Sequence, residues 1–350
     1  MSDNTFHGWV GLDKDSVNGK LVEMDYQVKP FEDTDIDIEI SHCGMCASDL
    51  HMLRSGWGPT NYPIVVGHEI VGKVIRKGAS VTGLEIGDRV GVGAQSSSCL
   101  KCYMCTHDNE QYCPDVVSTY GMSYPDGSPA MGGYGKKHRV PAAFAFKLPD
   151  SIPSEIVAPM MCGGLTMYSP LKRYGAGPTK TVGIVGIGGL GHFGLLFAKA
   201  LGCKKIVAIS RSRSKEADAR KMGATDFIAT GEEGWAGKNV HSIDLIISTA
   251  NDVNIPMSDY LMLLTIGGYM VQVGVPEGPL PNFNTFPLIV SNAHLTGTGI
   301  GSRQDMRDMI KLVSELQIKS WIVPRPMSDV NQVLVDMENG KARYRYVLCN

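Results

Sequence analysis

The stretch Lys180–Gly202, KTVGIVGIGGLGHFGLLFAKALG, decides the fold of this chain. Its first part, KTVGIVG, is a short apolar run of the kind that forms a buried strand. The glycine-rich GIGGLG follows at once, and the residues from there to ALG favour a helix that glycine opens. Strand, glycine-rich turn and helix in this order indicate a nucleotide-binding βαβ unit, and a tight turn without ligand is the alternative.

Strand and helix patterns alternate beyond this stretch. The chain continues with strand KKIVAIS, helix KEADARKMGA, strands DFIAT and IDLIISTA, a helix over MSDYLMLLTIGG (257–268) and strand YMVQVGV (269–275). Such alternation predicts a doubly wound parallel sheet. We assign residues 156–295 to this Rossmann nucleotide-binding domain.

The chain before residue 155 has a different texture. Short apolar runs such as DIDIEISHCG and EIVGKVIRKG are separated by glycine and proline, which favours β-rich structure with long loops. After HLTGTGIGS, a helix over RQDMRDMIKLVSELQI leads to a β-rich tail that ends in RYRYVLCN. We therefore expect an α/β protein in which a β-rich domain (1–155) is interrupted by the Rossmann domain and resumed by residues 296–350.

Composition limits the partners. The 350 residues are 43% hydrophobic and 19% charged, with a net charge of -2. This charge provides no basic field for nucleic acid or an anionic membrane, and so favours a small-molecule partner. The beginning MSDNTFHGWV lacks the apolar core of a signal peptide, and no apolar run approaches a membrane span, which predicts a cytosolic protein.

Four of the nine cysteines lie within fifteen residues and follow C-x2-C-x2-C-x7-C. Clustered cysteines in a reducing compartment bind metal more often than they form disulfides. Four thiolates in one loop fill the coordination of a tetrahedral zinc, which makes the site structural. An iron–sulfur cluster and free thiols are the alternatives. The four residues are Cys99, Cys102, Cys105 and Cys113.

A second ligand set is scattered along the chain. It consists of Cys46, the pair His68 and Glu69, and Cys162. A catalytic zinc has about three protein ligands and one open position, and two thiolates with one imidazole satisfy that need. Spacing alone supports this assignment only weakly, because a single Cys or His is more often a packed core residue.

The end of the second Rossmann strand indicates the cofactor. NAD-binding proteins place an acidic residue there to accept the ribose 2′-hydroxyl. Here the strand ends at Ser210, and the sequence RSRSK of residues 211–215 contains no acid. Hydroxyls and cations suit a 2′-phosphate, so we expect NADP(H) bound by Ser210, Arg211 and Lys215. Arg213 is assigned to a solvated basic turn.

The sequence resembles the zinc-containing medium-chain alcohol dehydrogenases. Gly67–Val81, GHEIVGKVIRKGASV, fits their signature G-H-E-x2-G-x5-G-x2-V, and HCGMCASDLH matches the segment that carries their first zinc ligand. The four-cysteine lobe and GIGGLG lie at the family's usual distances. The resemblance runs from GWVGLD to RYRYVL and is strongest to the cinnamyl alcohol dehydrogenase branch, which includes broad-specificity fungal NADP-dependent enzymes. It implies a GroES-like catalytic domain beside the Rossmann domain.

The resemblance assigns roles to the scattered set. It makes Cys46, His68 and Cys162 the ligands of a catalytic zinc. Glu69 is then either a carboxylate that moves onto the metal or a neighbour that never touches it. Ser48 would bond the substrate oxygen and contact the cofactor, and His51 would exchange the proton with solvent through the nicotinamide ribose.

The resemblance also implies a set of cofactor contacts: Gly186, Gly188, Gly189, Leu190, Gly191, Thr166, Thr249, Gly274, Gly299, Ile300 and Gly301. One position departs from the family. Many relatives have His or Arg directly after the first zinc ligand, where it contacts pyrophosphate, and this chain has Ala47. We therefore expect a looser hold on the cofactor.

Substrate and assembly are also inferred from the resemblance. Trp57 resembles an aromatic residue of the substrate pocket, which favours aromatic or medium-chain aldehydes, and core packing is the alternative. NADPH dependence favours aldehyde reduction. A homodimer is implied, with Pro287–Ser302 near the interface. The competing hypotheses are a polyol dehydrogenase of the same superfamily and a catalytically silent relative of the kind recruited as a lens structural protein.

Overall fold

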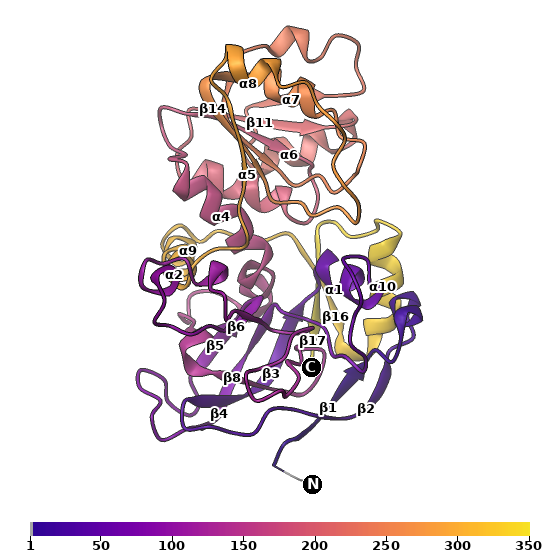
Figure 1. Ribbon diagram of the computed structural model, residues 1–350, viewed down its shortest axis with the longest axis vertical. Helices are drawn as coiled ribbons and strands as arrows, with labels where there is room; N and C mark the ends of the chain where they lie inside the picture. The colour runs from indigo at the N-terminus through magenta and orange to yellow at the C-terminus, as the bar shows by residue number, and fades with distance from the viewer. Residues whose placement is uncertain (1–2) are drawn as a thin grey trace. The chain divides into compact units, whose positions relative to one another are not determined.

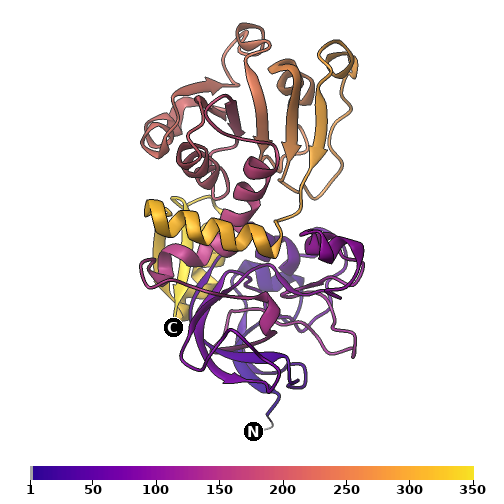
Figure 2. The same cartoon turned by 90° about the vertical axis from the view of Figure 1, so that its left-hand side faces the viewer.

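The computed structural model describes residues 3–350, which divide into two compact units. One consists of the chain up to Cys162 together with Ser302–Asn350, and the other is Gly163–Gly301. Figure 1 and Figure 2 show the first in indigo to purple and in yellow, and the second in magenta to orange. The sequence predicts the boundaries after residues 155 and 295. Between residues 3 and 350, no helix has the length and apolar character that crossing a membrane requires.

The unit Gly163–Gly301 contains a six-stranded parallel sheet in the order β12-β11-β10-β13-β14-β15. Its strands are β10 (Thr181–Val185), β11 (Lys205–Ser210), β12 (Asp226–Ala229), β13 (Ile243–Ser248), β14 (Leu264–Gln272) and β15 (His294–Gly297). Its helices are α4 (Gly163–Arg173), α5 (Gly191–Ala200), α6 (Glu216–Met222), α7 (Met257–Met262) and α8 (Phe286–Val290), with 3-10 turns η5 (Arg213–Lys215) and η6 (Gly237–Asn239). The predicted doubly wound sheet is confirmed.

One predicted helix in this unit is too long. The helix expected over 257–268 ends at Met262, and the strand β14 begins at Leu264. Gly267 has a φ of +74°, which a helix interior does not accept, and its N–H donates to Ser291 O (2.8 Å). Leu263 and Leu264 are buried, and a buried apolar pair fits a helix and a strand equally well. The apolar pattern alone therefore did not distinguish a helix from a strand here.

The other unit is β-rich. Its main sheet has the strand order β16-β17-β3-β4-β5-β9, with β8 pairing to β3. The strands are β1 (Thr5–Val10), β2 (Val22–Gln27), β3 (Asp35–Gly44), β4 (Ile70–Lys77), β5 (Arg89–Val92), β6 (Gln95–Ser97), β7 (Val117–Ser118), β8 (Lys137–Pro141), β9 (Ala145–Lys147), β16 (Ile322–Pro326) and β17 (Arg345–Cys349). The helices are α1 (Ala47–Leu53), α2 (Tyr103–Thr106), α3 (Ser154–Val157), α9 (Arg303–Leu316) and α10 (Val330–Glu338), with 3-10 turns η1 (Lys14–Asn18), η2 (Glu110–Tyr112), η3 (Ala142–Phe144), η4 (Ala158–Met161) and η7 (Met327–Asp329).

Strand β3 supplies the centre of this unit's core. Ile36, Ile38 and Ile40 recur with period two, and all three are almost completely buried. The alternate residues Asp35 and Asp37 are buried as well, which requires partners for their charges.

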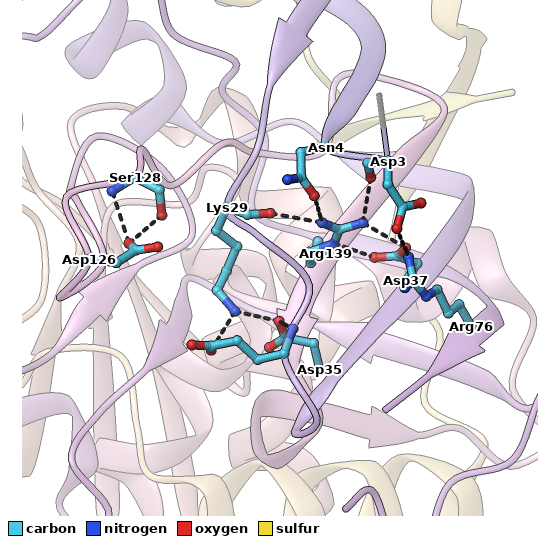
Figure 3. Close-up of polar contacts among 10 residues, drawn as sticks. Asp3, Asn4, Lys29, Asp35, Asp37, Arg76, Asp126, Ser128 and Arg139 are labelled. Carbon is cyan, nitrogen blue, oxygen red and sulfur yellow. Dashed lines mark hydrogen bonds and ion pairs between the residues drawn. The ribbon is translucent and has the colours of Figure 1, made fainter. Parts of the chain in front are cut away.

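Two buried cations supply those partners (Figure 3). Lys29 pairs with Asp35, and Arg139 of β8 donates from Nε to Asp37 Oδ1 (2.7 Å) and from Nη2 to Oδ2 (3.0 Å). The same guanidinium donates to the carbonyl of Lys29 (2.8 Å) and to Asn4 Oδ1 (2.7 Å). Arg139 thus joins the beginning of the described chain to two strands of the sheet.

The C-terminal segment completes the same sheet. Strand β17 pairs antiparallel with β3, in the register Leu348 to Cys43, and parallel with β16. Arg345 is therefore the first residue of a strand beside the one that leads to Cys46. The helix α9 begins at the capping residue Ser302, whose Oγ accepts from Asp305 N (3.0 Å).

Candidate metal centres and nucleotide site

The four lobe cysteines converge on one point. Their sulfurs lie 3.5 Å (Cys99–Cys113), 3.6 Å (Cys102–Cys105), 3.8 Å (Cys102–Cys113) and 3.9 Å (Cys99–Cys105) apart. Four sulfurs ~2.3 Å from a central ion, at the corners of a tetrahedron, lie about 3.8 Å from one another. The spacing fits a single tetrahedral ion. It leaves no room for the several irons and sulfides of a cluster.

The lobe backbone is arranged to stabilise thiolates. The N–H of Cys102 donates to Cys99 Sγ (3.3 Å), and the N–H of Asp115 donates to Cys113 Sγ (3.4 Å). Hydrogen bonds from the N–H groups of Lys101 and Cys102 lower the pKa of Cys99 to about 6, whereas burial raises that of Cys113 to about 12. The shifts of Cys99 and Cys113 thus have opposite directions. A divalent ion would let all four thiolates form.

A buried ion pair attaches the lobe to α9. Glu110, at the start of η2, is 1% exposed and accepts from Arg303 Nε (2.8 Å). Because Arg303 is the first residue of α9, this pair fixes the lobe to the C-terminal part of the unit.

The scattered ligand set also converges. One ligand atom from each of Cys46, His68, Glu69 and Cys162 lies within 4.8 Å of every other, and all four residues are buried. Cys46 caps α1, His68 and Glu69 precede β4, and Cys162 follows η4. Nε2 of His68 is buried and has no hydrogen-bond partner among residues 3–350. A buried imidazole nitrogen without a partner, beside two sulfurs, is what a metal ion would satisfy.

The charge state of this cluster points to a cation as well. A hydrogen bond from Cys162 holds the pKa of Cys46 well below its usual value, and the same contact raises that of Cys162 well above. The two sulfurs thus share one proton. Burial alone would lower the pKa of His68, but the negative charge of Cys46, Asp49 and Glu69 raises it to about 9. A divalent ion would replace both protons and leave two thiolates and a neutral imidazole.

Glu69 is bound by an arginine of the C-terminal strand. Nη2 of Arg345 donates to both carboxylate oxygens at 2.5 Å, and the two side chains are 3% and 0% exposed. The carboxylate also presses against Gly44, where a Cβ would lie 2.1 Å from Glu69 Oε2. Glu69 therefore lies within the ligand cluster, but its carboxylate forms an ion pair with Arg345.

Asp49 orders the loops around the ligands. This fully buried carboxylate accepts from the N–H of Cys46 (2.9 Å), the N–H of Gly67 (3.1 Å) and the hydroxyl of Tyr134 (2.7 Å). Its Oδ1 lies 3.9 Å from His68 Nδ1. A carboxylate on the far side of a ligating histidine fixes the ring and raises its basicity.

The first turns of α1 carry the residues expected to handle the substrate proton. Ser48 Oγ lies 3.5 Å from Cys46 Sγ, and His51 follows one turn later on the same side. The His51 ring stacks on Trp57, with centroids 4.6 Å apart. Trp57 is 42% exposed, so it does not belong to the core.

The glycine-rich turn has the shape that a pyrophosphate needs. Gly186 has a φ of +85°, and a Cβ on Gly191 would lie 1.8 Å from Gly186 O, so neither position accepts a side chain. At Gly188 a Cβ would meet nothing within 4 Å, which leaves the backbone accessible at the start of α5. Gly189 and Leu190 complete the turn before the helix. A backbone open to solvent at a helix N-terminus suits a phosphate.

The basic turn lies beside this loop. The carboxyl ends of β10 and β11 are neighbours, and the N–H of Gly186 donates to Ile209 O (2.9 Å), one residue before Ser210. Lys215 Nζ reaches back to the carbonyl of Ile187 (2.8 Å). Arg211 is exposed at the same end. Cationic groups thus gather where an adenosine 2′-phosphate would bind in a Rossmann fold.

Arg213 has other partners. Its guanidinium binds Glu232 at 2.6 Å and Glu216 at 2.8 Å on the surface. This agrees with its interpretation as a solvated turn residue.

The remaining predicted cofactor residues lie along the same unit. Thr249 Oγ1 donates to Val185 O (2.8 Å) and Gly186 O (3.1 Å), which ties the end of β13 to the glycine turn. A Cβ on Gly274 would lie 2.4 Å from Ala250 O, at the end of β14. Ile300 has a φ of +49° between Gly299 and Gly301, and Thr166 is buried in α4. Thr249 thus borders the glycine-rich turn, and Gly274 packs against the residues that follow β13. A Cβ on Gly301 would lie 2.8 Å from Ser169 of α4, the helix that also contains Thr166.

Comparisons with known proteins agree with this picture. A profile described as "Alcohol dehydrogenase GroES-like domain" matches residues 32–150, and one described as "Zinc-binding dehydrogenase" matches residues 189–315. The NADP-dependent alcohol dehydrogenase 6 of Saccharomyces cerevisiae is 44% identical over 328 residues, 92% of this chain and 91% of the yeast protein.

Two further comparisons extend the range of relatives. A probable mannitol dehydrogenase of Fragaria ananassa is 37% identical, over 97% of this chain and 94% of its own length. Among solved structures, a cinnamyl alcohol dehydrogenase of Sorghum bicolor has a TM-score of 0.93 and 34% identity, over 99% of this chain and 97% of the other.

Proposed function

The chain belongs to the zinc-containing alcohol dehydrogenase family of medium-chain dehydrogenases, and from this premise we propose that it transfers hydride between NADP(H) and an aldehyde/alcohol pair. The substrates proposed are aromatic or medium-chain aldehydes and the corresponding primary alcohols. Reduction is the proposed working direction.

Two zinc ions per chain fit the residues present. Cys99, Cys102, Cys105 and Cys113 would hold a structural ion, since their sulfurs fill a tetrahedron. Cys46, His68 and Cys162 would hold the catalytic ion, with Glu69 kept as a neighbour by Arg345. An ion bound by these three ligands supplies a Lewis acid for the substrate oxygen.

The Rossmann unit would bind the dinucleotide. The turn Gly186–Gly191 offers its backbone to the pyrophosphate, and Ser210, Arg211 and Lys215 offer a hydroxyl and two cations to the 2′-phosphate. The nicotinamide supplies the hydride. The side chains of this unit would therefore bind and orient the dinucleotide, and none of them would take part in a bond-breaking step.

Proton transfer belongs to α1. Ser48, beside Cys46, would hold the proton of the substrate hydroxyl, and His51 would pass it to solvent. An imidazole suits this task because its ordinary pKa lies near neutral pH. The stacking of His51 on Trp57 orients the ring, and the residue is half-buried.

The observation that carries the proposal is the buried convergence of Cys46, His68 and Cys162. Metal analysis tests it: the purified protein should contain two zinc ions per chain. Cys162→Ser should contain one and lose NADPH-dependent turnover. Cys203→Ser, which removes a thiol outside both clusters, should retain two and remain active. A Cys162→Ser protein that kept both ions would exclude the proposed ligand set.

A polyol dehydrogenase is the second candidate, because the chain is also similar to a probable mannitol dehydrogenase. The two candidates differ in substrate. Rapid reduction of benzaldehyde with little oxidation of mannitol supports the aldehyde/alcohol assignment, and the reverse supports the polyol. Absence of turnover with either, in protein that holds two zinc ions, would indicate the silent relative.

We also propose a cytosolic homodimer. All nine cysteines are free thiols, and two metal-binding thiol clusters need a reducing compartment. The strand β15 lies at the edge of the Rossmann sheet. Exposed apolar residues stand on the adjacent strand β14 (Ile266) and on α8, which precedes β15 in the chain (Phe286 and Ile289). Exposed apolar side chains and a free sheet edge favour pairing with a second copy.

A further inference from the structure

A cavity lies on the β-rich unit and shares no residue with either thiol cluster. It has a volume of about 660 Å³. Its walls are the loop 80–84, the segment 142–147 and one side of α9 from Arg307 to Lys311. Pockets for small organic molecules commonly have volumes of about 300–1,000 Å³. The cavity is thus large enough for such a ligand.

The inner wall of this cavity is apolar. Val81, Leu84, Phe146 and Ile310 line it, and each is less than one-tenth exposed. The short side chains of the alanines at 142, 143 and 145 leave the space open. An apolar body placed there would be removed from water against packed side chains, which is favourable in proportion to the area covered.

The rim of the cavity is cationic. Lys147, Arg307 and Lys311 line it, and none of the lining residues is acidic. Arg307 and Lys311 stand four residues apart on α9, so they project from one side of the helix, with Ile310 between them. The guanidinium of Arg307 lies 5.8 Å from the centroid of the Phe146 ring.

Nearby carboxylates neutralise only part of this charge. Lys147 Nζ lies 2.7 Å from Asp88 Oδ1, so this lysine is paired. Lys311 Nζ lies 3.9 Å from Glu315, and both side chains are more than half exposed, which makes that pair weak. Within residues 3–350, no carboxylate lies within 4.0 Å of the Arg307 guanidinium. Arg307 and Lys311 therefore present excess positive charge at the mouth of an apolar cavity.

We propose that this cavity binds a small organic monoanion: a free carboxylate on a medium-sized apolar body. The carboxylate accepts hydrogen bonds from Arg307, with Lys311 beside it, and the apolar body lies against Phe146 and Leu84. A bare inorganic anion would leave the apolar wall unused, and a neutral apolar molecule would leave the cations unused. The proposal does not depend on the proposed function, because none of its residues belongs to the metal or nucleotide sites.

Calorimetric titration of the zinc-loaded protein, with NADPH present, tests this inference with octanoate as the probe. Wild type should bind with a Kd below about 1 mM. The double variant Arg307→Gln/Lys311→Gln should bind at least tenfold more weakly. Lys319→Gln, which removes an exposed charge just beyond α9 and outside the cavity, should match wild type. Glutamine is a good helix former, so both exposed α9 substitutions keep the fold.

Ligand series and salt complete the test. Acetate and inorganic phosphate should show no saturable binding, and octanoate affinity should fall as salt is raised. Equal affinity in wild type and the double variant would place the octanoate elsewhere and overturn the proposal. So would acetate or phosphate binding as tightly as octanoate, because the apolar wall would then have no role. Absence of any octanoate binding by wild type would also refute it.

Discussion

The ion pair with Arg345 bears on whether Glu69 can act as a metal ligand. The two side chains form an ion pair that is almost completely buried, within a group that also contains two sulfurs and an imidazole. A carboxylate in that position would otherwise add a negative charge that burial penalises. Its engagement by Arg345 favours a ligand set of Cys46, His68 and Cys162, with Glu69 as an outer neighbour.

Replacing Arg345 by methionine should destabilise the protein strongly. Methionine keeps the length of the chain but leaves the Glu69 carboxylate buried without its cation, which costs about 3–5 kcal/mol. Thermal unfolding of the zinc-loaded variant measures the loss. The double variant Arg345→Met/Glu69→Gln removes both charges and should recover at least half of it. A single variant as stable as wild type, or a double variant no better than the single, would show that the pair has no such role.

Ala47 occupies the position where we expect many relatives to have His or Arg. It is the first residue of α1 and is exposed. Ala47→Arg should lower the Kd for NADPH at least fivefold, because a charge-assisted hydrogen bond to pyrophosphate is stronger than a neutral one. Ala47→Gln, which adds length without charge, should change the Kd by less than twofold. Fluorescence titration decides this, and an unchanged or higher Kd in Ala47→Arg would refute the expectation.

Residues with a local signature were predictable from sequence, and their partners were not. The lobe cysteines and the pair His68 and Glu69 stand in short motifs, and the structure gathers both sets. Arg345 and Asp49 were missed, because their roles depend on which strands and loops the fold brings together. The sequence contained one weak signal for Arg345. It is a charged residue in the tail RYRYVLCN, whose other residues favour a buried strand.

At the scale of elements, β8 holds a histidine in an unusual state. His138 is 3% exposed, and burial lowers its pKa to about 4. The unfolded chain has an ordinary histidine pKa of 6.5 there. Between these values the unfolded state binds more protons than the folded one. This contribution to stability is therefore complete above pH 6.5 and is lost as the pH falls towards 4.

The pH dependence of unfolding tests this state. For His138 alone, the free energy of unfolding should fall by about 3 kcal/mol between pH 6.5 and pH 4. Denaturant titrations of wild type and His138→Gln at a series of pH values separate this residue from other groups. The variant should show a shallower decline. Parallel curves for the two proteins would mean that His138 is charged in the folded state.

Helices and strands were predicted well where the hydrophobic pattern was long or was bounded by glycine. The strand, glycine turn and helix of Lys180–Gly202 became β10 and α5. The helix over 257–268 was wrong beyond Met262, because the apolar run LMLLTI fits either a buried helix or a buried strand. This segment is a strand because it pairs with β13 and β15 in the sheet. The local sequence does not indicate which strands will lie beside it.

At the scale of the whole molecule, two stretches at opposite ends of the chain build one unit. The pairing of β17 with β3 joins them, and Arg139 secures the beginning of the described chain to the same sheet. The β-rich texture of the tail predicted this return, but it did not indicate which strand the tail pairs with. Pairing between distant strands leaves no periodic signal in either strand alone.

The proposed homodimer has a direct test on the Rossmann unit. Ile289 of α8 is 74% exposed, and a charge there would oppose burial against a second copy. Sedimentation velocity should show a dimer for wild type and a shift to monomer for Ile289→Glu at micromolar concentration. Ile86→Glu changes an equally apolar residue, 66% exposed on the other unit, and should remain dimeric. A dimeric Ile289→Glu would place the interface elsewhere, and a monomeric wild type would exclude it.

Zinc, NADP(H) and hydride transfer together define the activity that we assign to this protein. The most direct test follows the absorbance of NADPH, and separately of NADH, with cinnamaldehyde in protein that contains two zinc ions per chain. We predict rapid oxidation of NADPH and little of NADH, because Ser210, Arg211 and Lys215 stand where NAD-binding proteins have an acid. Equal or faster oxidation of NADH would contradict the account of the cofactor site.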